Sequence, residues 1–306
     1  MFKEFKIICK VIIFLTFTFI SSSHGQYIVQ QIEYELPVNY NLLPEDAEFD
    51  TPSEEAKFFL NIPESKLKQA AESEGRELDI QKSTIYIDGD NIAIENISES
   101  GKVTMISNNS KDRIYYIIWS SKKVYEIKPE DFREIEKQAK AVSEEMLKSL
   151  SPELRGQVKA EMQKKSPQIK YEAKSTGRKM KKYEFDCEQY IIDTEKEIIS
   201  LWVTDDTFSI IPKIHQATKK ITAIFPSDGN EDIDEWELVP GKIPVVVSKF
   251  KLDMMNEPVL EISAITKIVK TKPSADKFHI PGNKDGFTTG SMQDMMKQMM
   301  PDENNE

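Results

Sequence analysis

The chain has 306 residues, of which 39% are hydrophobic and 30% are charged, and its formal net charge is −11 at pH 7. This length is sufficient for one large domain or two small ones with a substantial apolar core. The acidic balance disfavours nonspecific binding to nucleic acid or to anionic lipid surfaces, because both require a concentrated positive field.

The first 25 residues have the pattern of a secretory signal peptide. Lys3, Lys6 and Lys10 precede an apolar run from Val11 to Ile20, and small or polar residues follow from Ser21 to Gly25. A membrane-spanning helix needs roughly 20 apolar residues, so this run is too short to be an anchor. We therefore predict cleavage after Gly25, no integral membrane segment in the mature chain, and a periplasmic or extracellular location.

Cleavage would leave 281 residues with a net charge of −13, because the signal carries three lysines and one glutamate. Cys187 would then be the only cysteine, and one thiol cannot form an internal disulfide. Asp186 and Glu188 flank it, and nearby negative charge raises a thiol pKa. We predict a buried structural thiol rather than a nucleophile.

The mature chain is expected to begin with a strand and a helical insertion. Apolar residues alternate from Tyr27 to Leu36 with one irregularity in register, which predicts a strand that ends at Pro37. Prolines and short helical patterns over residues 39–76 predict a surface insertion. Its helices are expected at Ser53–Leu60 and Glu64–Glu74.

Two groups of strands are predicted on either side of a helical hairpin. Short runs of β-branched and aromatic residues, separated by Gly, Asn and Asp turns, are typical of an antiparallel meander. Helical spacing of apolar residues predicts the hairpin over residues 129–162. The expected strands are 84–87, 92–97, 103–107, 113–119 and 123–128 before the hairpin, and 168–173, 180–193, 198–203, 242–253 and 258–271 after it, with a turn at Thr176-Gly177.

A helix with one apolar stripe is predicted from Phe208 to Phe225, directly after Asp205 and Asp206. Because aspartate is a preferred N-cap, one of these carboxylates is expected to cap the helix rather than to form an acid–base pair. The apolar side chains of this stripe and a nearby tryptophan are the candidates for lining a ligand cavity: Trp202, Phe208, Ile211, Ile214, Ile221 and Phe225.

No pattern in the sequence indicates catalysis or a cofactor. The mature chain holds only His215 and His279, and it lacks the spacing motifs of zinc, thiol, hydrolase and nucleotide chemistry. We therefore predict a protein that is not an enzyme and that binds no cofactor and no nucleic acid. A catalytic centre assembled from distant residues would leave no such motif.

The segment from Gly282 to Glu306 is polar, rich in methionine and acidic at its end, and we predict that it is disordered. Thioether sulfur suits Cu(I), so copper handling is one alternative for this segment. An adaptable hydrophobic contact surface is another. The five methionines are Met292, Met295, Met296, Met299 and Met300.

Several segments together resemble an uncharacterised exported bacterial domain family, itself similar to the LolA and LolB type of periplasmic lipoprotein carrier. The resemblance covers roughly residues 84–281 and rests on short motifs. The residues that carry it are Ser151-Pro152-Glu153-Leu154-Arg155, Tyr183, Cys187, Tyr190, Leu201-Trp202-Val203-Thr204-Asp205-Asp206, Gly241-Lys242-Ile243-Pro244 and Phe278-His279-Ile280-Pro281.

The resemblance implies an α+β fold in which a curved antiparallel sheet, an open half-barrel, packs against helices in a single domain over residues 26–281. It also implies a soluble carrier whose partner is an apolar ligand, either a lipid or the acyl chain of a lipoprotein. A structural or interaction protein of the envelope is the alternative. The oligomeric state does not follow from the sequence.

Overall fold

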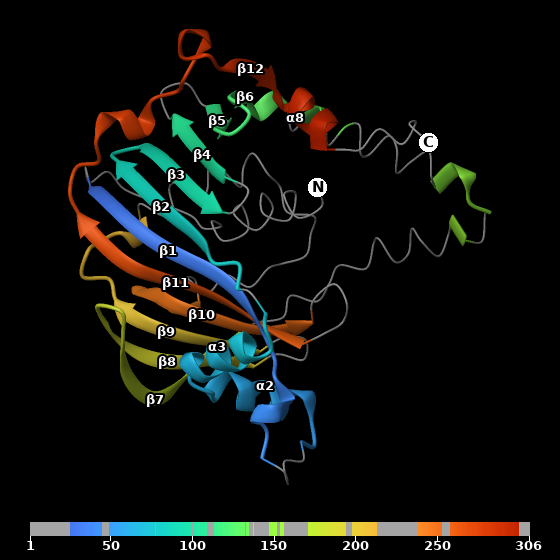
Figure 1. Ribbon diagram of the computed structural model, residues 1–306, viewed down its shortest axis with the longest axis vertical. Helices are drawn as coiled ribbons and strands as arrows, with labels where there is room; N and C mark the ends of the chain where they lie inside the picture. Colours follow the sequence, from blue (N-terminus) through green and yellow to red (C-terminus); the bar gives the residue numbers. More distant parts are fainter. Residues whose placement is uncertain are drawn as a thin grey trace.

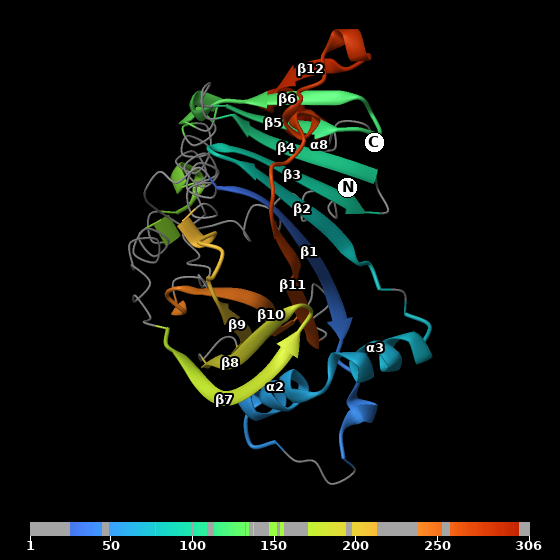
Figure 2. The ribbon, with the colours of Figure 1, turned by 90° about the vertical axis from the view of Figure 1, so that its left-hand side faces the viewer.

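The computed structural model describes residues 25–44, 49–76, 78–98, 101–108, 113–131, 133–134, 137, 147–151, 154–155, 171–193, 198–212, 238–252 and 258–299. These residues form a 12-stranded sheet in the order β12-β6-β5-β4-β3-β2-β1-β11-β10-β9-β8-β7 (Figure 1). Neighbouring strands are antiparallel, except that β12 runs parallel to β6. The sheet is strongly curved and does not close, as Figure 2 shows.

Strands dominate the described residues, and helices are few. The strands are β1 (Gln26–Pro37), β2 (Gln81–Asp88), β3 (Asn91–Ser98), β4 (Gly101–Asn108), β5 (Arg113–Ile118), β6 (Lys123–Ile127), β7 (Ala173–Lys182), β8 (Phe185–Asp193), β9 (Ile198–Asp205), β10 (Lys242–Leu252), β11 (Pro258–Lys270) and β12 (Thr288–Ser291). The helices are α2 (Pro52–Asn61), α3 (Glu64–Ser73) and α8 (Met292–Met299), with short 3-10 turns at η1 (Tyr40–Leu42), η2 (Ala275–Phe278) and η3 (Asn283–Asp285).

Some predicted segments lie wholly or largely outside the described residues. They are the signal peptide up to residue 24, most of the hairpin 129–162, most of the helix 208–225 and the chain after residue 299. Within the part of the chain that is described, no helix is both long and apolar enough to cross a membrane.

Strand β1 joins two halves of the sheet. It pairs on one side with β2, the first strand of the meander β2 to β6, and on the other with β11. The pairing with β11 shifts register between Gln30 and Gln31, so the predicted irregularity in this strand is confirmed as a bulge. The meander itself is also confirmed, with strand bounds within a few residues of those predicted.

The helices predicted within residues 39–76 are confirmed as α2 and α3, but the prediction that this segment lies on the surface is wrong. Thr51 caps α2 by accepting a hydrogen bond from the backbone N–H of Glu54. The apolar sides of the helices then pack on the sheet: Phe59 of α2 is 0% exposed and Leu67 of α3 is 2% exposed. Both belong to the main core, so the segment is an integral layer of the fold.

The turn predicted at Thr176-Gly177 is also wrong. The chain runs through Gly177 as one strand, β7, and the pairing of β7 with β8 shifts register between Ser175 and Lys179. The reversal comes instead at Tyr183, whose backbone has a φ of +52°. Glycine in a strand often marks a bulge rather than an end, and this one does so.

The expected disorder after residue 281 is contradicted for residues 282–299. Strand β12 extends the sheet along β6, and the α8 helix begins with reciprocal hydrogen bonds between Ser291 and Asp294. Phe287 and Met295 are 6% and 5% exposed, so this segment buries apolar surface despite its polar composition. The sheet therefore extends beyond the domain limit predicted at residue 281.

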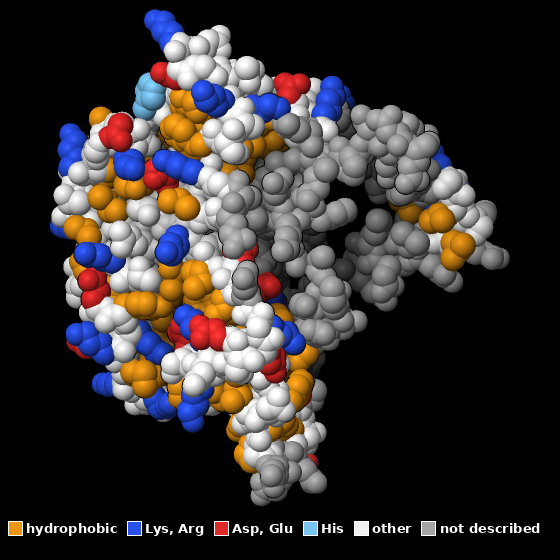
Figure 3. All heavy atoms as spheres, viewed as in Figure 1, with side chains coloured by type: hydrophobic (Ala, Val, Ile, Leu, Met, Phe, Trp, Pro, Cys, Tyr) orange, Lys and Arg blue, Asp and Glu red, His pale blue; other side chains and the backbone are white. Residues whose placement is uncertain are grey.

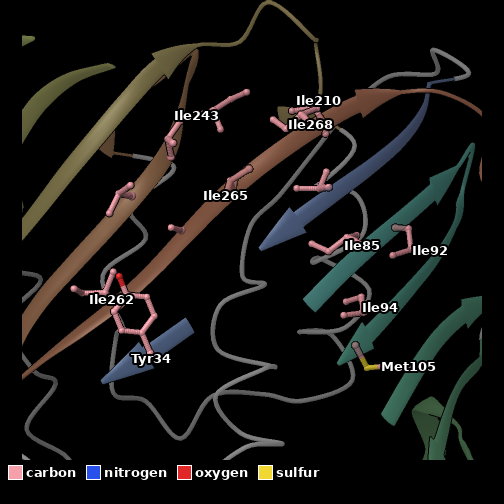
Figure 4. Packing of buried hydrophobic residues seen from close by; sticks show 14 of the residues in the cluster. Tyr34, Ile85, Ile92, Ile94, Met105, Ile210, Ile243, Ile262, Ile265 and Ile268 are labelled. Atoms are coloured by element: carbon pink, nitrogen blue, oxygen red, sulfur yellow. The ribbon is translucent and has the colours of Figure 1, made fainter. Parts of the chain in front are cut away.

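The main core lies on one face of the sheet, the face that carries Val29, Tyr34 and Ile262 and packs against α2 and α3. We call this the inner face; Figure 4 shows part of its cluster of buried side chains, drawn from β1 through β4, β10 and β11. The opposite, outer face has two smaller clusters, one around Ile106 and one around Leu201. A ligand cavity between the inner face and the helices α2 and α3 would require no separation of paired strands.

Candidate functional site

A cavity of about 300 Å³ lies between the inner face and the junction of α2 and α3. In Figure 2 these helices are seen at the foot of the sheet, beside the strands β7 to β10. The size is at the lower end of the range for small-molecule sites. Its lining residues are Phe59, Leu60, Asn61, Ile62, Pro63, Glu64, Ser65, Leu67, Arg178, Met180, Lys182, Gln189, Trp202, Val246, Ser248, Leu260 and Ile262.

The wall of the cavity is apolar because strand alternation directs every second side chain to the inner face. Trp202 of β9 stands opposite Val246 of β10, and Leu260 and Ile262 follow on β11. Phe59 faces them from α2, where its ring stacks at 6.3 Å from that of Phe250. These side chains offer an acyl chain or another apolar group a surface already removed from water.

A buried glutamine contributes to the polar part of the wall, which also includes Asn61, Glu64, Ser65, Arg178, Lys182 and Ser248. Gln189 is 1% exposed, and its Nε2 donates to the hydroxyl of Ser200 at 3.0 Å. The hydroxyl of Thr176 donates to Gln189 Oε1 at 3.2 Å. Each end of the amide thus has a hydrogen-bond partner within the protein, and an apolar ligand beside it would not leave either end without one.

Two cations stand over Trp202. The Nζ of Lys182 is 4.8 Å from the Trp202 ring centroid, and the Cζ of Arg178 is 5.9 Å from it. These distances are within the range of cation–π attraction. Arg178 also donates through Nη1 to Oδ1 of Asn61 at 2.5 Å, which connects β7 to the end of α2.

On the helical side of the cavity, Glu64 is held by Tyr34, which donates its hydroxyl to the carboxylate, and by Lys68 at 2.7 Å. Burial alone would raise the pKa of Glu64, but hydrogen bonds from Lys68 and Tyr34 and the charges of Lys68 and Lys182 lower it below its usual value. Burial, with the hydrogen bond to Glu64, raises the pKa of Tyr34. Glu64 is therefore ionised at neutral pH and already has its partners.

Cys187 is buried, as the sequence predicted, at 3% exposure. Burial is the main reason that its pKa rises to about 11, whereas Lys182 acts to lower it and Asp186 acts to raise it. The prediction of a buried thiol with a raised pKa is therefore confirmed, but burial contributes more to the raised pKa than the flanking carboxylate of Asp186 does. A thiol with this pKa is almost entirely protonated near neutral pH and does not act as a nucleophile.

Helical residues begin only at Ile211, so neither aspartate is the N-cap that was predicted, but the backbone N–H groups at this start are bonded by the side chain of Asp206. Its Oδ1 accepts a hydrogen bond from the backbone N–H of Ile210 at 3.0 Å, and its Oδ2 accepts one from Ile211 at 3.1 Å. Ile210 is fully buried in the inner-face cluster that Figure 4 shows, and the hydroxyl of Tyr27 donates to the carbonyl of Phe208 at 2.6 Å. The start of the 208–225 segment is therefore fixed on the inner face.

Of the predicted ligand-lining residues, Trp202 lines the cavity. Phe208 and Ile211 pack against the inner-face core but are not among the residues that line the cavity. Ile214, Ile221 and Phe225 lie outside the described residues.

Sequence reasoning missed the contributions of Phe59, Arg178 and Lys182 to this site. Lys182 lines the cavity, whereas its neighbour Lys181 does not. The face on which Arg178 and Lys182 lie follows from the reversal at Tyr183, which pairs Lys182 with Phe185 and gives no turn signal in the sequence.

Metal binding has little support among the described residues. They contain no cluster of three or more His, Cys, Asp or Glu side chains placed to hold a metal ion. Met292 and Met295 of the Met-rich segment, for which copper handling was one alternative, are packed into the inner-face core. Their sulfur atoms serve the fold in this arrangement.

The solved structures to which the chain is similar include two proteins of comparable extent but low sequence identity. An uncharacterised conserved protein from Thermus thermophilus has 7% identity and a TM-score of 0.36, with 94% of this chain and 99% of that chain covered. A LolA superfamily protein from Nitrosomonas europaea has 9% identity and a TM-score of 0.27, with 85% and 93% covered. No protein-family model and no curated protein matches the chain. Similarities with TM-scores this low assign no function to the chain.

Proposed function

We propose that this protein is an exported, soluble, non-enzymatic domain that holds an apolar ligand, a lipid or a lipoprotein acyl chain, between its inner face and α2–α3. The observation that carries the proposal is the cavity of about 300 Å³ with buried apolar walls. Transferring an alkyl chain into such a space contributes about 0.8 kcal/mol per methylene group. Export rests on the lysines and apolar run of residues 1–25.

Filling the cavity tests this proposal. Ser248 lines it from β10, opposite Ile262 of β11. In Ser248→Phe the added ring occupies the space of the ligand, and we expect binding of a fluorescent alkyl probe to fall by at least about tenfold. Ser248→Ala is the matched control, because it removes the hydroxyl without filling the cavity, and it should bind as the wild type does.

The probe titration uses mature protein purified without detergent, with thermal unfolding of each variant measured alongside it. Folded Ser248→Phe that binds the probe as tightly as Ser248→Ala would contradict ligand binding in this cavity. If the wild type, like the variants, bound no alkyl probe, the proposal as a whole would be contradicted.

A role as an interaction protein is the second candidate, and one observation favours it. Strand β7 ends the sheet, and most of its residues are exposed. An exposed strand edge can pair with another chain. The lysines of β7 oppose this, because natural sheets use such residues to prevent edge pairing. Concentration-independent sedimentation as a monomer would exclude self-association through this edge.

A further inference from the structure

Strand β7 places its positive charges on both faces of the sheet, and only one pair reaches the cavity. Within this strand Arg178, Met180 and Lys182 line the cavity, whereas Lys179 and Lys181 do not. Lys181 stands opposite Asp186 of β8 and Lys179 opposite Glu188 in the β7–β8 pairing. Between Arg178 and Lys182, alternation thus gives each face two cations.

The charge of this strand contrasts with that of the protein. The chain has a net charge of −11, but β7 carries five cations and no carboxylate: Lys174, Arg178, Lys179, Lys181 and Lys182. In Figure 3 blue side chains gather at the lower left of the molecule, where Figure 1 shows β7 and β8. Protection of a sheet edge explains outward lysines, but it does not require two cations directed into an apolar cavity.

The two inward cations are available to an anion. Arg178 bonds to the neutral side chain of Asn61, and among the described residues neither Arg178 nor Lys182 forms an ion pair with a carboxylate, although the charge of Lys182 acts on Glu64 and lowers the pKa of that carboxyl. Glu64, the acidic residue of the cavity lining, is bonded to Tyr34 and Lys68. Beside Trp202 a guanidinium and an ammonium therefore converge at a place where the apolar wall ends.

We propose that the cavity selects a single-chain anionic amphiphile, with its alkyl tail against the apolar wall and its carboxylate or phosphate head group between Arg178 and Lys182. This inference rests on the proposed function and specifies its ligand class. A guanidinium matches a carboxylate or phosphate through paired hydrogen bonds, and an ammonium adds a second charge-assisted bond. Lys182 is half-buried beside the apolar wall, which strengthens its bond, whereas Arg178 is exposed at the mouth.

The test compares ligands that share one tail. Dodecanoate, dodecyl phosphate, dodecanol and dodecylamine are titrated at pH 8 below their aggregation limits into the full mature protein by calorimetry. We expect both anions to bind at least about tenfold more tightly than dodecanol, and the amine to bind more weakly than dodecanol. Inorganic phosphate and acetate, which supply the head group alone, should not displace dodecanoate at the same concentration.

Paired variants locate the selectivity. In R178Q/K182Q we expect the preference for anions over dodecanol to disappear while dodecanol binding persists, which also shows that the variant is folded. K179Q/K181Q removes the same charge from the same strand on the other face, and it should keep the preference. Loss of the preference in both variants to the same extent would overturn the head-group site in favour of a general field of the strand.

The remaining outcomes distinguish a failure of anion selection from a failure of ligand binding in the cavity. Equal binding of dodecanoate and dodecanol to the wild type would overturn anion selection and leave an apolar carrier. Displacement of dodecanoate by phosphate alone would overturn selection for an amphiphile. Binding of none of the four ligands would contradict the cavity as a lipid site altogether.

Discussion

Replacing Phe59 with alanine tests whether α2 is part of the core. The side chain is 0% exposed, and its ring lies 5.7 Å from that of Tyr40, 5.4 Å from that of Phe58 and 6.3 Å from that of Phe250. Truncating a buried phenylalanine costs about 3–5 kcal/mol, from lost burial and from the cavity that remains. Because Phe59 also lines the ligand cavity, the new space joins an existing one, and we expect the lower end, about 3 kcal/mol.

The assay is urea unfolding of the mature protein at 25 °C, followed by circular dichroism and by tryptophan fluorescence. Lys57→Ala is the control on the same helix, because Lys57 forms an exposed ion pair with Asp193, and such pairs contribute at most about 1 kcal/mol. If Phe59→Ala lowered the free energy of unfolding no more than Lys57→Ala, α2 would be the surface insertion that the sequence first indicated.

Three further predictions concern other parts of the fold. Cys187, with a pKa of about 11, should react with a thiol reagent at pH 8 far more slowly in the native protein than in urea; comparable rates would refute its burial. Glu95 lies under hydrogen bonds from Lys102 and Lys277 that, against the effect of burial, lower its pKa below the usual 4.5. The contribution of Glu95 to the free energy of unfolding is therefore present above pH 4.5 and is lost as the pH falls through the lowered pKa. The wild type and Glu95→Gln should differ in urea unfolding at pH 6 and should converge in acid. A difference that stays constant with pH would contradict this. Met295→Ala should lower the free energy of unfolding by about 2–5 kcal/mol without any added metal, whereas an unchanged value would mean that the helix α8 is dispensable to the core.

Strand order along the chain was well predicted because local signals define it. Alternation from Tyr27 to Leu36 predicted β1 and its bulge, and the Asp88-Gly89-Asp90 turn separated β2 from β3. Gly177 misled because a glycine in a strand and a glycine in a turn look alike in sequence. The true reversal contains Tyr183 at a φ of +52°, and tyrosine gives no turn signal.

Longer-range features were beyond local patterns. The composition of residues 282–306 predicted disorder, yet Phe287 packs its ring against Trp119 at 5.4 Å and thereby helps to fix the segment on the sheet. Similarly, the site around Trp202 depends on β7 pairing with β8 and on α2 folding back over the sheet. Neither contact can be recognised from a local sequence motif. The contact of α2 with the sheet joins residues that are remote in sequence, and the pairing of β7 with β8 depends on strand register.

The measurement that bears most directly on the carrier hypothesis is native mass spectrometry of the mature protein, purified without detergent from the compartment to which it is exported, with solvent extraction of bound molecules. We predict a reproducible adduct whose extract contains an acyl chain, and we expect Ser248→Phe to lack it. Folded wild-type protein that carries no such molecule, and takes up none when lipids are offered, would contradict the carrier function.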